Sequence, residues 1–230
     1  MKERTASVDT YIREYQLEAL FPQGFRRNIK TYSFQKGDVL FTTGEELTEL
    51  YFLVEGKIKI FTVTLEGRSL INRFKTPLAL LGDVEYIRGT SVLNSVEAIS
   101  DGVMLAASFA DVKELEKSHP ALVRFLLEKV AEKFYTASQA TSMHMLYPVE
   151  VRLASYLLSI SSDGEGTVFH EEMRTENLTE LAEWIGTSYR HLNRVLKKMT
   201  SEAIIERKNG AIKIIDLDKL RELANGNIYE

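Results

Sequence analysis

Hydrophobic positions in the first half of the chain form short stretches that are rich in β-branched and aromatic residues. They lie at residues 29–34, 39–41, 50–54, 57–63, 69–74, 92–99 and 103–106. Turn residues separate the first five, with glycine at 37, 44, 56 and 67; glycine accepts the positive φ of tight turns. Short strands at close spacing predict a small antiparallel barrel or roll, preceded by a short helix over about residues 8–21.

From residue 109 the hydrophobic spacing becomes helical. Residues 109–117 predict a short helix, and Pro120 then lies near the first turn of a much longer one. Apolar positions along the longer helix alternate four and three apart, in a seam of Val123, Leu127, Val130, Phe134, Ala137, Thr141 and His144. This heptad seam predicts a parallel coiled coil between two copies of the chain. The alternative is a helix packed only on its own β-roll, and both contacts can coexist because Leu122, Phe125 and Leu126 widen the apolar face.

Residues 177–199 have the pattern of a helix-turn-helix. The apolar side of the first helix consists of Leu178, Leu181, Ala182 and Ile185. Gly186 follows it, where the sharp turn favours a left-handed residue, and Ser188 can cap the second helix. The buried stripe of the second helix is predicted at Leu192, Val195, Leu196 and Met199. The remaining residues near its N-terminal half then face outward, as in a recognition helix.

Residues 203–215 predict a β-hairpin, because both residues of Asn209-Gly210 accept positive φ. This hairpin has the position of a wing, and the order helix, turn, helix, basic hairpin predicts a winged helix-turn-helix that binds DNA. The candidate DNA contacts are Ser188, Tyr189, Arg190, His191, Asn193, Arg194, Lys197, Lys198, Arg207 and Lys208. We expect Arg190, Asn193 and Arg194 to read bases, and the remaining basic residues mainly to hold phosphates.

Charge and composition narrow the class of protein. The net charge of −4 and the pI of about 5.7 argue weakly against nucleic-acid binding, but residues 189–213 contain seven basic and two acidic residues, and phosphates meet only the local surface. The chain has no cysteine, which fits a reducing cytoplasm and excludes a cysteine-ligated iron–sulfur cluster. No apolar run reaches the roughly 18 residues of a membrane span, and no secretory signal is expected at residues 1–4.

Pro148 supplies the expected boundary between the long helix and the DNA-binding part, because proline ends or kinks a helix. The predicted domains are residues 1–118 as a β-roll sensor, 119–147 as a dimerisation helix and 148–230 as the winged helix-turn-helix. The predicted fold class is therefore α+β, with an N-terminal double-stranded β-roll, a long helix and a C-terminal winged helix-turn-helix.

The chain resembles the Crp/Fnr family of bacterial transcription regulators over nearly its whole length. Residues 32–41, 44–46 and 50–61 resemble the family's β-roll, which is of the cyclic-nucleotide-binding type, and residues 81–85 lie where the family has its Gly-Glu phosphate cassette. Residues 74–87 and 185–192 are most similar to the YeiL-type branch. The resemblance implies a cytoplasmic, dimeric, sequence-specific regulator that binds operator DNA, responds to a signal at the β-roll and, if an activator, contacts RNA polymerase.

Two departures from the family pattern bear on ligand and operator. Members that bind cyclic AMP carry an Arg-Ser pair about ten residues after the cassette, whose arginine neutralises the phosphate. Residues 92–95 read Val-Leu-Asn-Ser here, so we expect cyclic AMP not to bind. In the recognition helix, Arg190 replaces a family glutamate that accepts from cytosine, whereas Arg194 falls on a family arginine. At position 190 a hydrogen-bond donor thus replaces the family's acceptor, so we do not expect this protein to bind the family's usual operator sequence.

Other sites are less informative. His119, His144, His170 and His191 lack the spacing of a metal site, and no nucleophile elbow or phosphate loop occurs, so we expect neither a metal nor an enzyme. For an effector pocket between the β-roll and the long helix, the polar candidates are Arg73, Tyr86, Arg88 and Ser138; each has the alternative of an ordinary surface or structural role. The alternative function is a ligand-binding module without DNA affinity. The effector, the operator, the regulated genes and the direction of regulation are not encoded in any recognisable motif.

Overall fold

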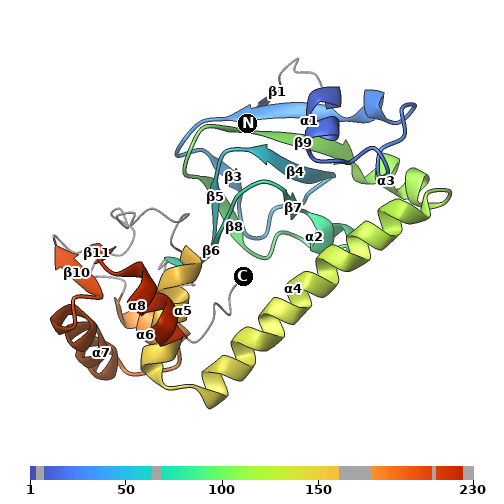
Figure 1. Cartoon of the computed structure of the whole chain (residues 1–230). Coiled ribbons are helices and arrows are strands. Elements are labelled where there is room, and N and C mark those ends of the chain that lie inside the picture. Colours follow the sequence, from blue (N-terminus) through green and yellow to red (C-terminus); the bar gives the residue numbers. More distant parts are fainter. Residues whose placement is uncertain (4–7, 64–68, 161–177, 209–210, 225–230) are drawn as a thin grey trace. The chain divides into compact units, whose positions relative to one another are not determined.

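The computed structural model describes the chain except residues 4–7, 64–68, 161–177, 209–210 and 225–230 (Figure 1). The fold divides into two compact units, one of residues 1–62 and 75–133 and one of residues 63–74 and 134–230. The long helix α4 (Pro120–Leu146) contributes to both units. The domain limits expected from the sequence, at residues 118 and 147, stay predictions.

Antiparallel strands dominate the first half of the chain. One sheet has the order β1-β2-β9-β4-β7 and the other the order β3-β8-β5-β6. The strands are β1 (Lys2–Glu3), β2 (Lys30–Phe34), β3 (Val39–Phe41), β4 (Glu49–Glu55), β5 (Ile58–Val63), β6 (Ser69–Lys75), β7 (Ala79–Leu81), β8 (Ser95–Ala98) and β9 (Gly102–Ser108). The helical segments are α1 (Val8–Glu14), the 3₁₀ turn η1 (Arg26–Asn28), α2 (Asp83–Arg88) and α3 (Phe109–Glu116). The predicted small antiparallel roll is confirmed; β1, β7 and α2 were not predicted, and the helix expected over about residues 8–21 ends at Glu14.

Strand β4 separates two hydrophobic clusters of the first unit, because successive side chains of a strand point to opposite faces. Leu50, Phe52 and Val54 belong to the cluster that α1 and α4 cover. Tyr51 and Leu53 belong to the cluster between the two sheets. Both faces of β4 are therefore buried, which explains why its sequence reads as a continuous apolar run rather than an alternation.

The first half of α4 packs on the first of these clusters. Leu122 and Leu126 are buried in it, and the ring of Phe125 stacks near that of Phe52, with centroids 6.2 Å apart. The packing of this helix on its own β-roll is therefore confirmed. The predicted seam residues Val123, Leu127 and Phe134 remain exposed on the helix.

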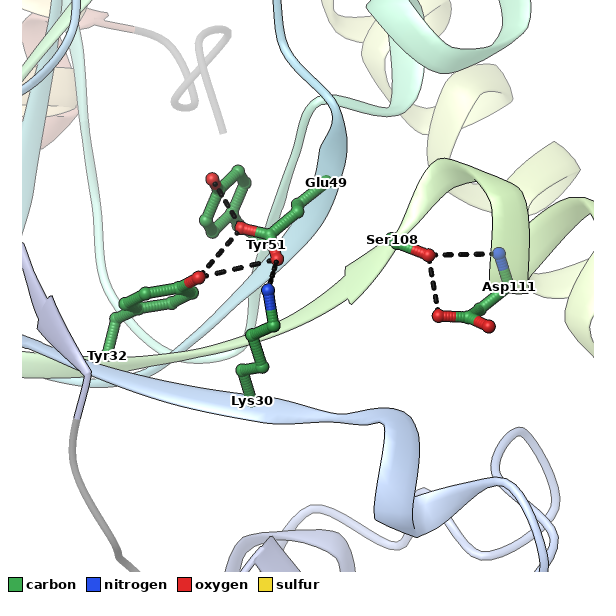
Figure 2. A network of polar contacts seen from close by, with 6 residues as sticks. All are labelled: Lys30, Tyr32, Glu49, Tyr51, Ser108 and Asp111. Carbon is green, nitrogen blue, oxygen red and sulfur yellow. Dashed lines mark hydrogen bonds and ion pairs between the residues drawn. The ribbon is translucent and has the colours of Figure 1, made fainter.

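A buried carboxylate joins strands β2 and β4. The side chain of Glu49 is 11% exposed, and its carboxylate accepts hydrogen bonds from Lys30 Nζ at 3.0 Å, from Tyr32 Oη at 3.1 Å and from Tyr51 Oη at 3.0 Å (Figure 2). Burial, and then the negative charge of Glu49, raise the pKa of Tyr51 well above its ordinary value. The carboxylate thus satisfies two phenol groups that the apolar cluster would otherwise leave unpaired.

The same sheet leads into α3 through a capped start. Ser108 ends β9, and its Oγ accepts from the amide of Asp111 at 3.0 Å and donates to the Asp111 carboxylate at 2.6 Å (Figure 2). The serine satisfies one of the amides that the first turn of a helix leaves without a partner. This cap fixes the point at which the strand pattern gives way to helix.

The second unit is mainly helical around a small sheet. After α4 it contains α5 (Val149–Ile160), α6 (Leu178–Trp184), α7 (Tyr189–Ser201), β10 (Ile205–Lys208), β11 (Ala211–Ile214) and α8 (Leu217–Ala224). The strands pair antiparallel with Ile205 opposite Ile214 and Lys208 opposite Ala211. The predicted helix-turn-helix and wing strands are confirmed, and α8 was not predicted. The hairpin turn at residues 209–210 lies outside the described residues.

No helix in the part of the chain that the structure describes is long and apolar enough to cross a membrane.

Replacing Glu49 by alanine should destabilise the first unit by roughly 2–3 kcal/mol, because it removes the acceptor of the buried Tyr51 hydroxyl and of the half-buried Tyr32 hydroxyl. Ser108→Ala, which removes only the cap of α3, should cost about 1 kcal/mol. Urea unfolding followed by circular dichroism measures both changes. Trp184, the single tryptophan, lies in α6 of the second unit, so its fluorescence reports that unit separately. An equal cost for the two variants would contradict the role given to Glu49.

Candidate nucleic-acid interface

The orientation of helix α7 follows from its buried stripe. Leu192, Val195, Leu196 and Met199 are each at most 2% exposed and belong to the core of the second unit. Ser188 precedes the helix with extended backbone angles, and its Oγ accepts from the amide of His191 at 3.2 Å. The stripe and the cap were both predicted, and both are confirmed. Together they fix which side chains of α7 face away from the core.

The exposed side of α7 is basic. Arg190, Arg194 and Lys197 are exposed and follow one another at spacings of four and three, so they lie on one face of the helix. Tyr189 is exposed at the first position of the helix, next to the exposed cap Ser188, whereas His191 and Asn193 are half-buried. Guanidinium and ammonium groups on one helix face can donate to base edges and to phosphate oxygens.

The wing is tied to this helix by a hydrogen bond. Arg207 on β10 donates from Nη1 to Oδ1 of Asn193 on α7, at 3.3 Å. Arg207 is half-buried, while Lys208 at the end of the same strand is exposed. The structure thus brings a predicted base-reading residue and a predicted phosphate contact together, although they are 14 residues apart in the sequence.

Lys198 differs from its neighbour Lys197 in having an acidic partner. Its Nζ lies 3.1 Å from Oε1 of Glu150 on α5. The hydrogen bond to Glu150, and then the charge of that carboxylate, raise the pKa of Lys198. Both side chains are partly exposed, so the pair is accessible to solvent. A phosphate at this position would have to compete with Glu150.

Arg152 is a structural residue beside the helix-turn-helix that sequence reasoning missed. It lies on α5 and is buried, and its Nη1 donates to the carbonyl of Ile185 and, at 3.4 Å, to that of Gly186. Gly186 has a φ of 67°, as the predicted turn requires. The available signal was an arginine between the apolar positions Val151 and Leu153 of α5, because such a residue needs buried acceptors.

The structure describes the side chains of three of the four candidate effector residues, Tyr86, Arg88 and Ser138. Tyr86 donates from its hydroxyl to Oε2 of Glu116 on α3 at 2.7 Å, and its ring centroid lies 5.1 Å from that of Phe109. Burial, and then the hydrogen bond to Glu116, raise the pKa of Tyr86. Arg88 is exposed at the end of α2, and Ser138 is exposed on α4. The side chain of Arg73 lies outside the described ones, so a shared pocket stays a prediction.

The cassette region contains an ion pair in which the carboxylate is buried and the lysine is partly exposed. Asp83 is 1% exposed at the start of α2, and its Oδ1 lies 2.5 Å from Nζ of Lys133 on α4. Lys133 also donates to the carbonyl of Leu80 at 3.2 Å. Oδ2 of Asp83 is a buried oxygen without a partner among the described residues. Sequence reasoning located this segment, but it did not find Lys133, which is 50 residues away.

The histidines have ordinary surroundings where the structure describes them. Nε2 of His119 lies 2.7 Å from the carbonyl oxygen of Ala19, and His191 takes part in the cap of α7 through its amide. His170 and the side chain of His144 lie outside the described part of the chain. Within that part, no group of three or more histidine, aspartate or glutamate side chains could hold a metal ion.

Two domain families match the chain. Residues 151–223 match the Crp-like helix-turn-helix domain, and residues 31–119 match the cyclic nucleotide-binding domain. The regulatory protein YeiL of Escherichia coli O157:H7 is 26% identical over 196 residues, which cover 85% of each chain. The fumarate and nitrate reduction regulatory protein of Vibrio cholerae serotype O1 is 24% identical over 192 residues, covering 83% of this chain and 76% of the other.

Solved structures agree with these matches. A CRP/FNR-family transcriptional regulator from Thermus thermophilus aligns with a TM-score of 0.61 and 25% identity, covering 86% of this chain and 99% of the other. The c-di-GMP responsive global regulator CLP of Xanthomonas campestris aligns with a TM-score of 0.65 and 15% identity, covering 87% and 98%. The second likeness concerns the fold alone.

Proposed function

We propose that this chain, which belongs to the Crp/Fnr family of DNA-binding transcription regulators, reads a specific operator as a homodimer through α7 and its wing. The observation that supports the proposal best is the basic face of α7, which lies opposite a stripe anchored in the core. The signal acts at the β-roll and is unidentified. The protein works in the cytoplasm and, if it activates transcription, contacts RNA polymerase.

The proposed contacts divide into base readers and phosphate holders. Arg190 and Arg194 donate to base edges from the exposed face of α7, and Asn193 reads a neighbouring base. The phosphate holders are Lys197, Lys198, Arg207 and Lys208, and the residues at the start of the helix, Ser188, Tyr189 and His191, contact the backbone beside them. On DNA, Lys198 must exchange its bond to Glu150 for a phosphate. Arg207 can keep its bond from Nη1 to Asn193, because the guanidinium has further N–H groups that can donate to a phosphate.

The proposed homodimer uses the exposed seam of α4. Val123, Leu127 and Phe134 are 45%, 66% and 75% exposed, although the neighbouring Leu122 and Leu126 are buried in the first unit. A long helix with one apolar face in a core and a second in solvent gains stability when a second copy covers the second face. A dimer would place two copies of α7 about 34 Å apart on a pseudo-palindromic operator.

The proposal is tested by operator selection. The purified protein is bound to random duplex DNA at near-physiological salt, and the enriched fragments are sequenced. We expect an inverted repeat whose half-sites are about one helical turn apart. If no sequence is enriched across a salt series, while the protein still binds a small molecule tightly, the alternative of a ligand-binding module without DNA affinity would hold instead.

Arg194→Ala should weaken binding to the selected operator by roughly 1–3 kcal/mol and relax the base preference at one position of each half-site. The reason is the loss of a guanidinium that donates to a base edge. The matched variant is Lys208→Ala, which should weaken operator and random DNA alike and lower the salt dependence by about one counterion. Fluorescence anisotropy on both duplexes measures these changes. If Arg194→Ala weakened binding to the operator and to random DNA equally, Arg194 would not be a base-reading residue.

Leu127→Asp should weaken the dimer at least about tenfold, because the two-fold axis brings two carboxylates into one apolar seam. Sedimentation velocity over a concentration series measures the change. The control is Ala121→Asp, which adds the same charge at an exposed position off the seam. A monomeric wild-type protein, or a Leu127→Asp protein that associates like wild type, would contradict the proposed interface.

A further inference from the structure

We propose that Arg152 is a positioning residue for DNA recognition: it fixes the turn between α6 and α7 and so sets the direction in which α7 presents its basic face. This inference rests on the proposed function, because it concerns the same recognition helix. Arg152 itself lies on α5, outside the helix-turn-helix, and does not belong to the exposed basic face.

The contacts of Arg152 are concentrated on the turn. Its side chain is buried, and one terminal nitrogen donates to the carbonyls of Ile185 and Gly186. Those carbonyls follow the last turn of α6, where helix geometry leaves carbonyl groups without intrahelical partners. A cation is favoured at this end of a helix because the aligned peptide dipoles make it partly negative. The arginine therefore supplies a hydrogen-bond donor to the carbonyls of Ile185 and Gly186. The left-handed conformation of Gly186 allows the turn but provides no such donor.

The turn between α6 and α7 is so short that a displacement of its first carbonyls is passed directly to α7. Only Gly186, Thr187 and Ser188 separate Ile185 from the first residue of α7. The amide of Thr187 donates back to the carbonyl of Ala182 at 2.8 Å, and Ser188 caps α7. A shift of the two carbonyls would thus be passed to the cap and to Tyr189 and Arg190 beyond it. Base readout tolerates little displacement, since bidentate donors must meet particular acceptor atoms.

The geometry also separates a positioning role from general stability. The backbone amide of Arg152 donates to the carbonyl of Pro148 at 3.2 Å, so α5 starts independently of the side chain. Further along α5, Ser155 is also buried and donates to the carbonyl of Ala224 on α8 at 3.3 Å. It makes the same kind of bond from the same helix to a different helix end. Ser155→Ala is therefore a matched control that does not touch the turn.

The experiment compares Arg152→Met, which keeps the aliphatic stem, with Ser155→Ala in the full-length protein. Affinities for the selected operator and for a scrambled duplex are measured by fluorescence anisotropy, at a temperature where both variants are folded. We expect Arg152→Met to lose about tenfold on the operator and less than about twofold on the scrambled duplex, where the unchanged basic residues dominate. Ser155→Ala should leave the ratio of the two affinities unchanged.

Hydrogen exchange at the Thr187 amide gives a readout that does not depend on DNA. Arg152→Met should exchange faster there, whereas Ser155→Ala should not. If Arg152→Met does not fold, Arg152→Lys decides, because it keeps the charge but not the planar guanidinium: it should show faster exchange and a smaller operator-specific loss. An unchanged affinity ratio, or unchanged exchange at Thr187, would overturn the inference. A wild-type protein without any preferred duplex would instead refute the proposed function itself.

Discussion

Burial of the apolar stripe of α7 is the constraint on which the proposed DNA-binding surface depends. Each buried aliphatic side chain stabilises the fold by roughly 1.5–3 kcal/mol relative to an exposed one. Rotating the helix by one residue would expose Leu192 and its neighbours and turn charged side chains toward the core, where unpaired charges are strongly unfavourable. The direction of Arg190 and Arg194 is thus set by residues that never meet DNA. The cap at Ser188 then fixes where the helix begins, and the role proposed for the buried Arg152 is to hold the turn that precedes it.

Features with a local cause could be predicted from the sequence. The hydrophobic residues of α4 and α7 recur with a helical period over several turns. The positive φ of Gly186 could be expected because a glycine follows the apolar pattern of α6. Strand β7 was missed because Ala79, Leu80 and Leu81 include no β-branched or aromatic residue, unlike the equally short β3. Helix α2 was missed because six residues are too few to establish a helical period. Arg152 with Ile185, and Asp83 with Lys133, were missed for another reason: their partners are 33 and 50 residues away, and no local pattern encodes such a separation.

Position on a helix face also says little about the partners of a side chain. Lys197 and Lys198 are adjacent in the sequence and chemically identical, yet only Lys198 is paired with Glu150 in the structure. In α4 the period predicted one wide apolar face, and the fold divides it between the first unit and solvent. In both cases the sequence specifies which residues lie on a surface, and the arrangement of more distant elements decides what that surface contacts.

The bond between Asn193 and Arg207 links two functions of the proposed interface, base reading and phosphate binding. Asn193 belongs to the recognition helix and Arg207 to the wing. An arginine already held in place loses less side-chain freedom when it meets a phosphate. A substitution at position 193 would consequently alter base preference and also release the wing arginine. In the evolution of this protein, operator choice and overall binding strength would then be inherited together, and a lineage that changes its target sequence through this residue would need a compensating change in the wing.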